Sequence, residues 1–331
     1  MVDAAQNLWK SLGSQLAGTF LAPGSTYSLA ALACSFALFV ALAVPAKRGR
    51  ILRHRVLLRA LFPRRLLHSV SGRADLAWFV SGLLFSGVSI GWALFSAEQL
   101  HGWALALLGP APAPWLPGWA GAGLATLLLF LAYEFAYWLD HLLMHRVPAL
   151  WAFHKIHHQA ESLSLFTNGR VHPLETIGFY NLVALCMGVT GALLERTLGA
   201  GVTQWHIGGT NLLILLFAVC VTHLQHSHLW LTFGPRIGHV LLSPAHHQIH
   251  HSEDPAHFNR NFGSCLSLWD AAFGTLHAPG ARRERLRFGA APDPGDAPAH
   301  SVTGVLITPF LAAGRRLIPA RGRPVRAPAA L

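Results

Sequence analysis

Charged residues are scarce in this chain: they make up 12% of its 331 residues, whereas hydrophobic residues make up 53%. That balance excludes an ordinary soluble domain, in which about a quarter of the residues are charged. Acids are scarcest, with 14 Asp and Glu against 25 Lys and Arg, and the net charge is +11. No nucleic-acid-binding motif accompanies this charge. We therefore expect a membrane protein attracted to anionic lipid headgroups, with no nucleic acid among its partners.

Cysteine and cofactor motifs are also lacking. The four cysteines (Cys34, Cys186, Cys220 and Cys265) have no disulfide or metal-site spacing and are expected to be small core residues. There is no Gly-x-Gly-x-x-Gly after a strand and no Cys-x-x-Cys-His. The sequence therefore predicts no flavin, nicotinamide or haem site, and no cofactor-binding residue other than metal ligands.

Histidine, in contrast, is abundant: 15 of the 21 histidines fall between positions 141 and 251. Three motifs contain most of them: His141-x3-His145, His154-x2-His157-His158 and His247-x2-His250-His251. Residues three and four apart share a helix face, so each motif is expected to point two or three imidazoles at one spot. One tetrahedral zinc ion needs at most four ligands, and these motifs supply eight. The pattern predicts a site for two metal ions. A single i, i+4 pair of histidines would be weaker evidence, because such a pair more often lies on a protein surface without binding a metal.

Other histidines are candidates from separate segments. His172 precedes Pro173 at a predicted helix start. His223 and His226 are three apart and can face the same way, and the sequence leaves open whether His223 or His228 is a ligand. Six scattered histidines are expected to be non-ligands: His54, His68, His101, His206, His277 and His300.

Five apolar stretches are long enough to span a bilayer, for which about 20 residues are needed. They are Tyr27–Val44, Leu76–Phe95, Trp119–Leu139, Ile177–Leu194 and Ile207–Val221. The last two contain Asn and Gly, so they can be tilted, short, or a hairpin that does not fully cross. Residues 45–73 carry nine Lys and Arg and no acid, whereas residues 96–118 carry neither Lys nor Arg. The positive-inside rule then places the N-terminus outside and all the histidine motifs on the cytoplasmic side.

Glu134 lies on the predicted helical stripe that includes His141 and His145. An acid in an apolar span is costly unless it is paired. Glu134 could orient a ligating imidazole, or it could bond to Tyr137 or a neighbouring helix, and the sequence favours neither.

The motifs, taken together, resemble those of the fatty acid hydroxylase/sterol desaturase superfamily of integral-membrane di-iron oxygenases. The resemblance covers about residues 134 to 275. It rests on His141-Leu-Leu-Met-His145, Leu150-Trp151-Ala-Phe-His154-Lys-Ile-His157-His158, Arg170-Val-His172-Pro173-Leu-Glu175, Gln225-His226, Ser243-Pro244-Ala-His246-His247-Gln-Ile-His250-His251 and Asn261-Phe262-Gly263…Leu268-Trp269-Asp270…Phe273-Gly274-Thr275.

The resemblance implies an all-α fold: an integral-membrane helical bundle of four to five spans with a cytoplasmic helical cap that holds two iron ions. It divides the chain into an N-terminal membrane region (1–117), a catalytic domain (118–277) and a basic tail (278–331). Glu134 and Asn261 are the predicted catalytic residues. The predicted metal ligands are His141, His145, His154, His157, His158, His172, His226, His246, His247, His250 and His251.

Two positions depart from the family's pattern. The first motif often reads His-Arg, but Leu142 follows His141 here, and the family's Asn-Tyr-Gly has Phe262 in place of Tyr. Neither change removes a ligand, so both concern substrate and rate more than the metal centre.

The predicted activity is oxidation of a lipid C–H bond with O2, by hydroxylation in preference to desaturation or ether cleavage, in a multi-pass protein of the bacterial cytoplasmic membrane. Electrons must come from a separate donor, such as a ferredoxin or cytochrome b5-like protein with its reductase. Arg282, Arg283, Arg285 and Arg287 suit such an acidic carrier, but contact with lipid headgroups is favoured. The alternatives are a divalent-metal transporter, for which ligands near the bilayer midplane are expected, and a catalytically inactive lipid-binding homologue.

Overall fold

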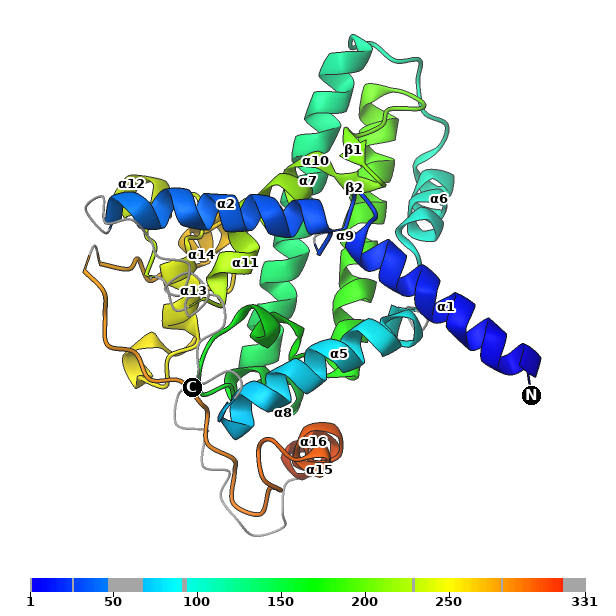
Figure 1. The fold of residues 1–331 in the computed structure, drawn as a ribbon. Helices are drawn as coiled ribbons and strands as arrows, with labels where there is room; N and C mark the ends of the chain where they lie inside the picture. The colour runs from blue at the N-terminus through cyan, green and yellow to red at the C-terminus, as the bar shows by residue number, and fades with distance from the viewer. Residues whose placement is uncertain are drawn as a thin grey trace. The chain divides into compact units, whose positions relative to one another are not determined.

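The computed structural model describes residues 2–25, 27–46, 68–90, 94–227, 230–280 and 282–317. Over these residues the fold is helical, as predicted, and the sheet is an antiparallel pair of two-residue strands, β1 (His206–Ile207) and β2 (Thr210–Asn211) (Figure 1). Most of the predicted basic loop, the tail after Leu317, His54 and His228 lie outside the described residues.

The α-helices follow in chain order: α1 (Val2–Phe20), α2 (Leu29–Ala46), α5 (Val70–Ile90), α6 (Ala97–Leu108), α7 (Gly118–Arg146), α8 (Pro148–His158), α9 (Pro173–Leu198), α10 (Leu212–Phe217), α11 (His223–Gln225), α12 (Gly234–Gly238), α13 (Pro244–His250), α14 (Leu268–Phe273), α15 (Val302–Leu306) and α16 (Thr308–Leu317). Two short 3-10 helices are η1 (Leu165–Gly169) and η3 (Pro255–His257), and η2 (Ala218–Thr222) is a π-helix.

Contacts divide the chain into two compact units. One comprises Met1–Ala37, Leu83–Tyr137 and Ile177–Cys220, and the other comprises Leu38–Gly82, Trp138–Thr176 and Val221–Leu331. All three histidine motifs fall in the second unit, where α16 also packs against α8. The predicted boundaries at residues 117 and 277 stay predictions.

Within the part of the chain that the structure describes, two helices are long and apolar enough to cross a bilayer by length and composition alone: α7, with 29 residues, and α9, with 26. A buried core helix passes the same test, so this finding alone is weak evidence for a membrane protein. The prediction of four to five spans is not confirmed beyond these two, and the bilayer side on which the histidines lie stays a prediction.

The fifth predicted span, Ile207–Val221, is interrupted. Gly208 and Gly209 have φ of 57° and 82° and close the hairpin between β1 and β2, a conformation that glycine adopts without strain. The Asn211 side chain then caps α10 by accepting from the N–H groups of Leu213 and Ile214. The apolar helical stretch that begins at Leu212 is consequently shorter than a span requires.

In the first unit, α6 forms within the region predicted to be an external loop. Ser96 caps this helix in a capping box with Gln99. The helix lies so close against α9 that a Cβ atom on Gly188 would be 2.6 Å from the carbonyl oxygen of Ala97. Glycine is thus required at position 188 for this helix packing.

Candidate metal centre

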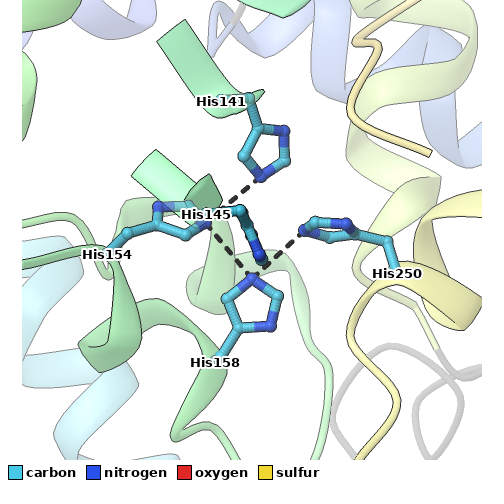
Figure 2. Close-up of side chains that lie close together, drawn as sticks. All are labelled: His141, His145, His154, His158 and His250. Atoms are coloured by element: carbon cyan, nitrogen blue, oxygen red, sulfur yellow. Dashed lines mark hydrogen bonds between the residues drawn. The ribbon is translucent and has the colours of Figure 1, made fainter. Parts of the chain in front are cut away.

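Five imidazoles converge at one point in the second unit, and we call them the five-histidine group (Figure 2). Their candidate ligand atoms all lie within 4.8 Å of one another, and four of the five residues are buried. They come from three helices: His141 and His145 from α7, His154 and His158 from α8, and His250 from α13.

Four further histidines form a second, fully buried cluster, the four-histidine group. It consists of His157, His226, His247 and His251, again with candidate ligand atoms within 4.8 Å of one another. The two groups adjoin, since the rings of His158 and His251 stack with centroids 4.5 Å apart. The structure therefore brings nine of the eleven predicted ligands into two adjacent groups.

Each of the two later motifs contributes to both groups rather than to one spot. On α8, His154 and His158 join the five-histidine group, whereas His157 joins the four-histidine group. At the end of α13 the assignment is the opposite one: His247 and its C-cap residue His251 are in the four-histidine group, whereas His250 is in the five-histidine group. Successive helical residues are rotated by about 100°, so adjacent histidines cannot reach one point. This division lets two short helices build two neighbouring sites.

Hydrogen bonds at Nδ1 fix the orientation of three rings in the five-histidine group. His141 donates to the carbonyl oxygen of Phe262 at 2.9 Å, His154 to Oε1 of Glu175 at 2.7 Å, and His250 to the carbonyl oxygen of Arg260 at 2.8 Å. Carbonyl and carboxylate oxygens only accept, so each of these three rings carries a hydrogen on Nδ1.

The Nε2 atoms of His141 and His154 are nevertheless only 3.1 Å apart, one of the close contacts drawn in Figure 2. Nδ1 of each ring is engaged by an acceptor, so Nε2 is the atom through which the two rings face each other and could bind a metal ion. His158 Nε2 is 3.2 Å from that of His154 and 3.1 Å from that of His250. The donor set therefore fits a metal ion held by neutral imidazoles.

Spacing in the four-histidine group supports the same conclusion. Nε2 of His226 lies 2.9 Å from that of His247 and 3.2 Å from those of His157 and His251. Nitrogen ligands about 2.1 Å from a metal in a tetrahedral site are about 3.4 Å from one another. The observed spacing is close to that value, and four buried imidazoles facing one another through the same atom match the requirements of a first-row metal.

Burial favours the neutral form of six of these imidazoles. Removal from water lowers the pKa of His226 to about 3 and that of His250 to about 3. Desolvation, followed by the neighbouring histidines, also lowers the pKa well below its usual value at His157, His158, His247 and His251. Protons therefore do not compete for the ligand lone pairs at neutral pH.

The metal-free protein should consequently lose stability as the pH falls. Unfolded histidines bind protons below about pH 6.5, whereas His226 and His250 stay neutral in the folded state down to pH values near 3. Each such residue removes about 1.4 kcal/mol of unfolding free energy per pH unit in that window. Thermal unfolding of chelator-treated protein should occur at a lower temperature at pH 5 than at pH 7.5. A constant unfolding temperature would show that these rings are not buried and neutral.

Glu175 is a site residue to which the sequence assigned no role. It lies in the first turn of α9, is buried, and accepts from His154 at 2.7 Å, so it performs the orienting task that was one of the two roles considered for Glu134. The feature of the sequence from which this role could have been predicted is its place in the motif Arg170-Val-His172-Pro173-Leu-Glu175. Glu134 itself is buried on α7 and belongs to neither histidine group.

We expect Glu175→Leu to weaken metal binding by the five-histidine group by about 10–100-fold, because His154 loses the acceptor that orients it. Glu175→Gln retains an acceptor oxygen and should have a smaller effect. Competition with a chelator would measure both. Glu195→Leu is the matched control, since Glu195 lies on the same helix and pairs with His101 at 3.0 Å. An equal loss in all three variants would contradict the role of Glu175.

The loop that orients His141 is held by Asp270. This buried carboxylate accepts from the N–H groups of Phe262 and Gly263 at 2.9 and 2.8 Å, and from the Thr275 hydroxyl at 2.6 Å. The carbonyl of Phe262 then faces His141. A Cβ atom on Gly263 would lie 2.1 Å from a backbone oxygen, so only glycine fits there. Asp270 thus positions the candidate ligand His141 indirectly, by holding the backbone of Phe262 and Gly263.

Asn261 is fully buried in the same loop, at a φ of 59°. Its side chain donates to the carbonyls of His246 and His277 at 3.0 Å and accepts from the N–H of His277 at 2.8 Å. These bonds to backbone favour a role in holding the loop over the catalytic role predicted from the sequence.

Two predicted ligands, His172 and His246, lie outside both groups because they cap helices. Nδ1 of His246 accepts from the N–H of Ser243, so this residue takes the place usually held by Glu or Gln in the capping box of α13. Nδ1 of His172 accepts from the N–H of Leu174 at the start of α9. His223, left open by the sequence, is buried on α11 but is in neither group.

A cavity of about 380 Å³ gives access to the histidines. Its walls include His145, His158 and His250 of one group and His251 of the other. Aromatic and polar side chains also line it, including Trp151, Phe258, Lys155 and Asn259. A molecule in this cavity would contact both histidine groups.

Comparison with known proteins identifies the same region. The fatty acid hydroxylase family matches residues 126–275, which contain both groups. The chain is 30% identical over 165 residues to an ornithine lipid hydroxylase of Rhizobium tropici, covering 50% of this chain and 45% of that protein. It is 25% identical over 172 residues to an alkylglycerol monooxygenase of Danio rerio (49% and 32%) and 32% identical over 157 residues to human cholesterol 25-hydroxylase (45% and 49%).

Residues 126–275 of the chain thus match the fatty acid hydroxylase family, which supports the resemblance seen in the sequence motifs. The relatives named above are lipid hydroxylases and monooxygenases. The match spans less than half the length of each of them. No solved structure matches the chain.

Proposed function

We propose that this protein is an integral-membrane lipid oxygenase in which each histidine group holds one iron ion. The observation that carries this proposal is the convergence of nine imidazoles in two adjacent groups, in each of which all candidate ligand atoms lie within 4.8 Å of one another. Buried neutral imidazoles hold divalent iron without adding negative charge. Membership of a family of hydroxylases supports iron in preference to zinc.

When bound, the two irons would supply the activation of O2 that insertion of oxygen into an unactivated C–H bond requires. The protein's own groups have simpler tasks. Glu175 and the carbonyls of Phe262 and Arg260 orient the ligating rings. Burial disfavours protonation of His158 and His251, and the cavity beside them provides space for a substrate.

The substrate that we propose is a lipid, hydroxylated in preference to desaturated. Three relatives are named for ornithine lipid, alkylglycerol and cholesterol, which share an apolar body with a polar end. Insertion of one oxygen atom from O2 consumes two external electrons, and the sequence contains no motif for a redox cofactor. We therefore propose a separate donor, a ferredoxin or cytochrome b5-like protein with its reductase, at the cytoplasmic face of the bacterial inner membrane.

Lipid analysis of a host strain tests this function. Mass spectrometry should detect lipids that are 16 mass units heavier when the protein is expressed with iron, a shift that follows from one added oxygen atom. A strain expressing His157→Ala at a matched membrane level should lack them. Lipids 2 mass units lighter would indicate desaturation instead, and identical lipids in all strains would contradict the proposal.

A further inference from the structure

The C-terminal helices α15 and α16 have their large apolar side chains on the outside. The residues that face inward are small or short: Gly304, Val305, Thr308, Pro309, Ala312 and Ala313. The exposed ones are large: Val302 (76% exposed), Leu306 (39%), Ile307 (52%), Phe310 (52%), Leu311 (58%) and Leu317 (70%). We call these six exposed residues the outer apolar face. Residues 302–317 lie outside the region that matches the hydroxylase family.

This arrangement is the reverse of a water-facing helix, in which large apolar side chains pack inward and polar ones face out. Single exposed apolar residues are common on proteins, but a contiguous apolar face marks a site of interaction with another protein or with a membrane. The position of the face in the fold decides between these two.

The outer apolar face lies beside one end of each helix that is long enough to cross a bilayer. Helix α16 packs against α8 (Figure 1), and α8 follows α7 after one intervening residue, Val147. The ring of Phe310 is 5.3 Å from that of His172, which directly precedes α9. If α7 and α9 span the bilayer, these ends, and therefore α15 and α16, lie at the boundary between lipid and water.

The charge of this region fits the same location. Arg315 and Arg316 end α16 and pair with Asp296 and Asp293. The remaining sequence adds three arginines at positions 321, 323 and 326 and no acid. Large apolar side chains next to arginines are typical of helices that lie in the plane of a membrane surface. We propose that α15 and α16 lie on the bilayer, with the outer apolar face buried among lipid chains.

Photocrosslinking of the full-length protein in its native membrane tests this proposal. A photoreactive p-benzoylphenylalanine replaces Leu311 in one variant and Phe310 in another. After irradiation, mass spectrometry of the purified protein identifies the molecule attached. We expect lipid adducts at both positions, several-fold above those at Ala256, an exposed residue of η3 that serves as the background control.

A further position calibrates the measurement. Leu127, 46% exposed on α7, should give lipid adducts if that helix crosses the membrane. The double variant Ile307→Ser with Leu317→Ser keeps the inward-facing residues and should reduce the lipid adducts formed from position 311. Crosslinks to a second copy of the chain or to another protein at 310 and 311 would overturn the proposal, as would adducts no more abundant than those at Ala256. Neither result depends on enzymatic activity.

Discussion

Replacing His247 and His251 together by alanine should lower the metal content of the purified protein from about two ions per chain to about one. This i, i+4 pair supplies half of the four-histidine group, and two imidazoles are too few to hold an ion against exchange. The five-histidine group is intact in that variant. Replacing His154 and His158 should have the complementary effect, since it removes two ligands from the other group. Activity should be abolished in both variants, as it should be with alanine at His154, His157, His158, His250 or His251 alone.

Elemental analysis after expression with ample iron measures this result, and zinc in place of iron counts as occupancy. The matched control is His246→Ala, because His246 adjoins His247 on α13 but caps the helix instead of joining a group. It should retain both ions, as should His101→Ala and His300→Ala. Loss of an ion from the His246 variant would mean that this residue is a ligand after all. One ion or none in the unmodified protein would contradict the two-metal proposal.

The second large effect is expected at a buried ion pair, and Asp75→Ala should lower the unfolding free energy by about 3–5 kcal/mol. Asp75 and Arg170 are both fully buried, with Nη1 2.8 Å from the carboxylate. Arg170 also donates from Nε to the carbonyl of Ile156 at 2.6 Å, between His154 and His157. The variant would leave the guanidinium buried without its counter-charge, and it would loosen the segment of α8 that carries three metal-site histidines.

Thermal unfolding in detergent, compared with metal content, measures this effect. The control is Glu161→Gln, because the Glu161 side chain is 61% exposed where it pairs with His300, and this variant should change stability by less than about 1 kcal/mol. The double variant Asp75→Leu with Arg170→Met replaces both charges by apolar groups and should be more stable than Asp75→Ala alone. If Asp75→Ala were as stable as the control, the pair would not hold α8 in place.

The histidine motifs and the helical class were predictable from the sequence because both depend on local spacing. An i, i+4 repeat places two side chains on one helix face wherever that helix lies, and the pairs His154 with His158 and His247 with His251 each lie within one group. Four of the five predicted apolar stretches correspond to helices: α2, α5, α7 and α9. The fifth is interrupted by a turn at Gly208 and Gly209 and a helix cap at Asn211, which agrees with the alternative of a short stretch with a hairpin that its Gly and Asn residues had suggested.

Only the tertiary structure could decide which histidines lie in the same group. The sequence treats His246 and His247 alike, but a rotation of about 100° per residue, together with the direction in which α13 meets α8 and α7, turns one into a cap and the other into a candidate ligand. Some of the supporting partners are also distant in sequence: Phe262, which accepts from His141, lies 121 residues from it, and Asp75 lies 95 residues from the Arg170 that it pairs with. The sequence by itself determined that this protein has helices with histidines at ligand spacing. The packing of those helices decided how the histidines divide into two groups, because contacts between distant segments leave no periodic signal along the chain.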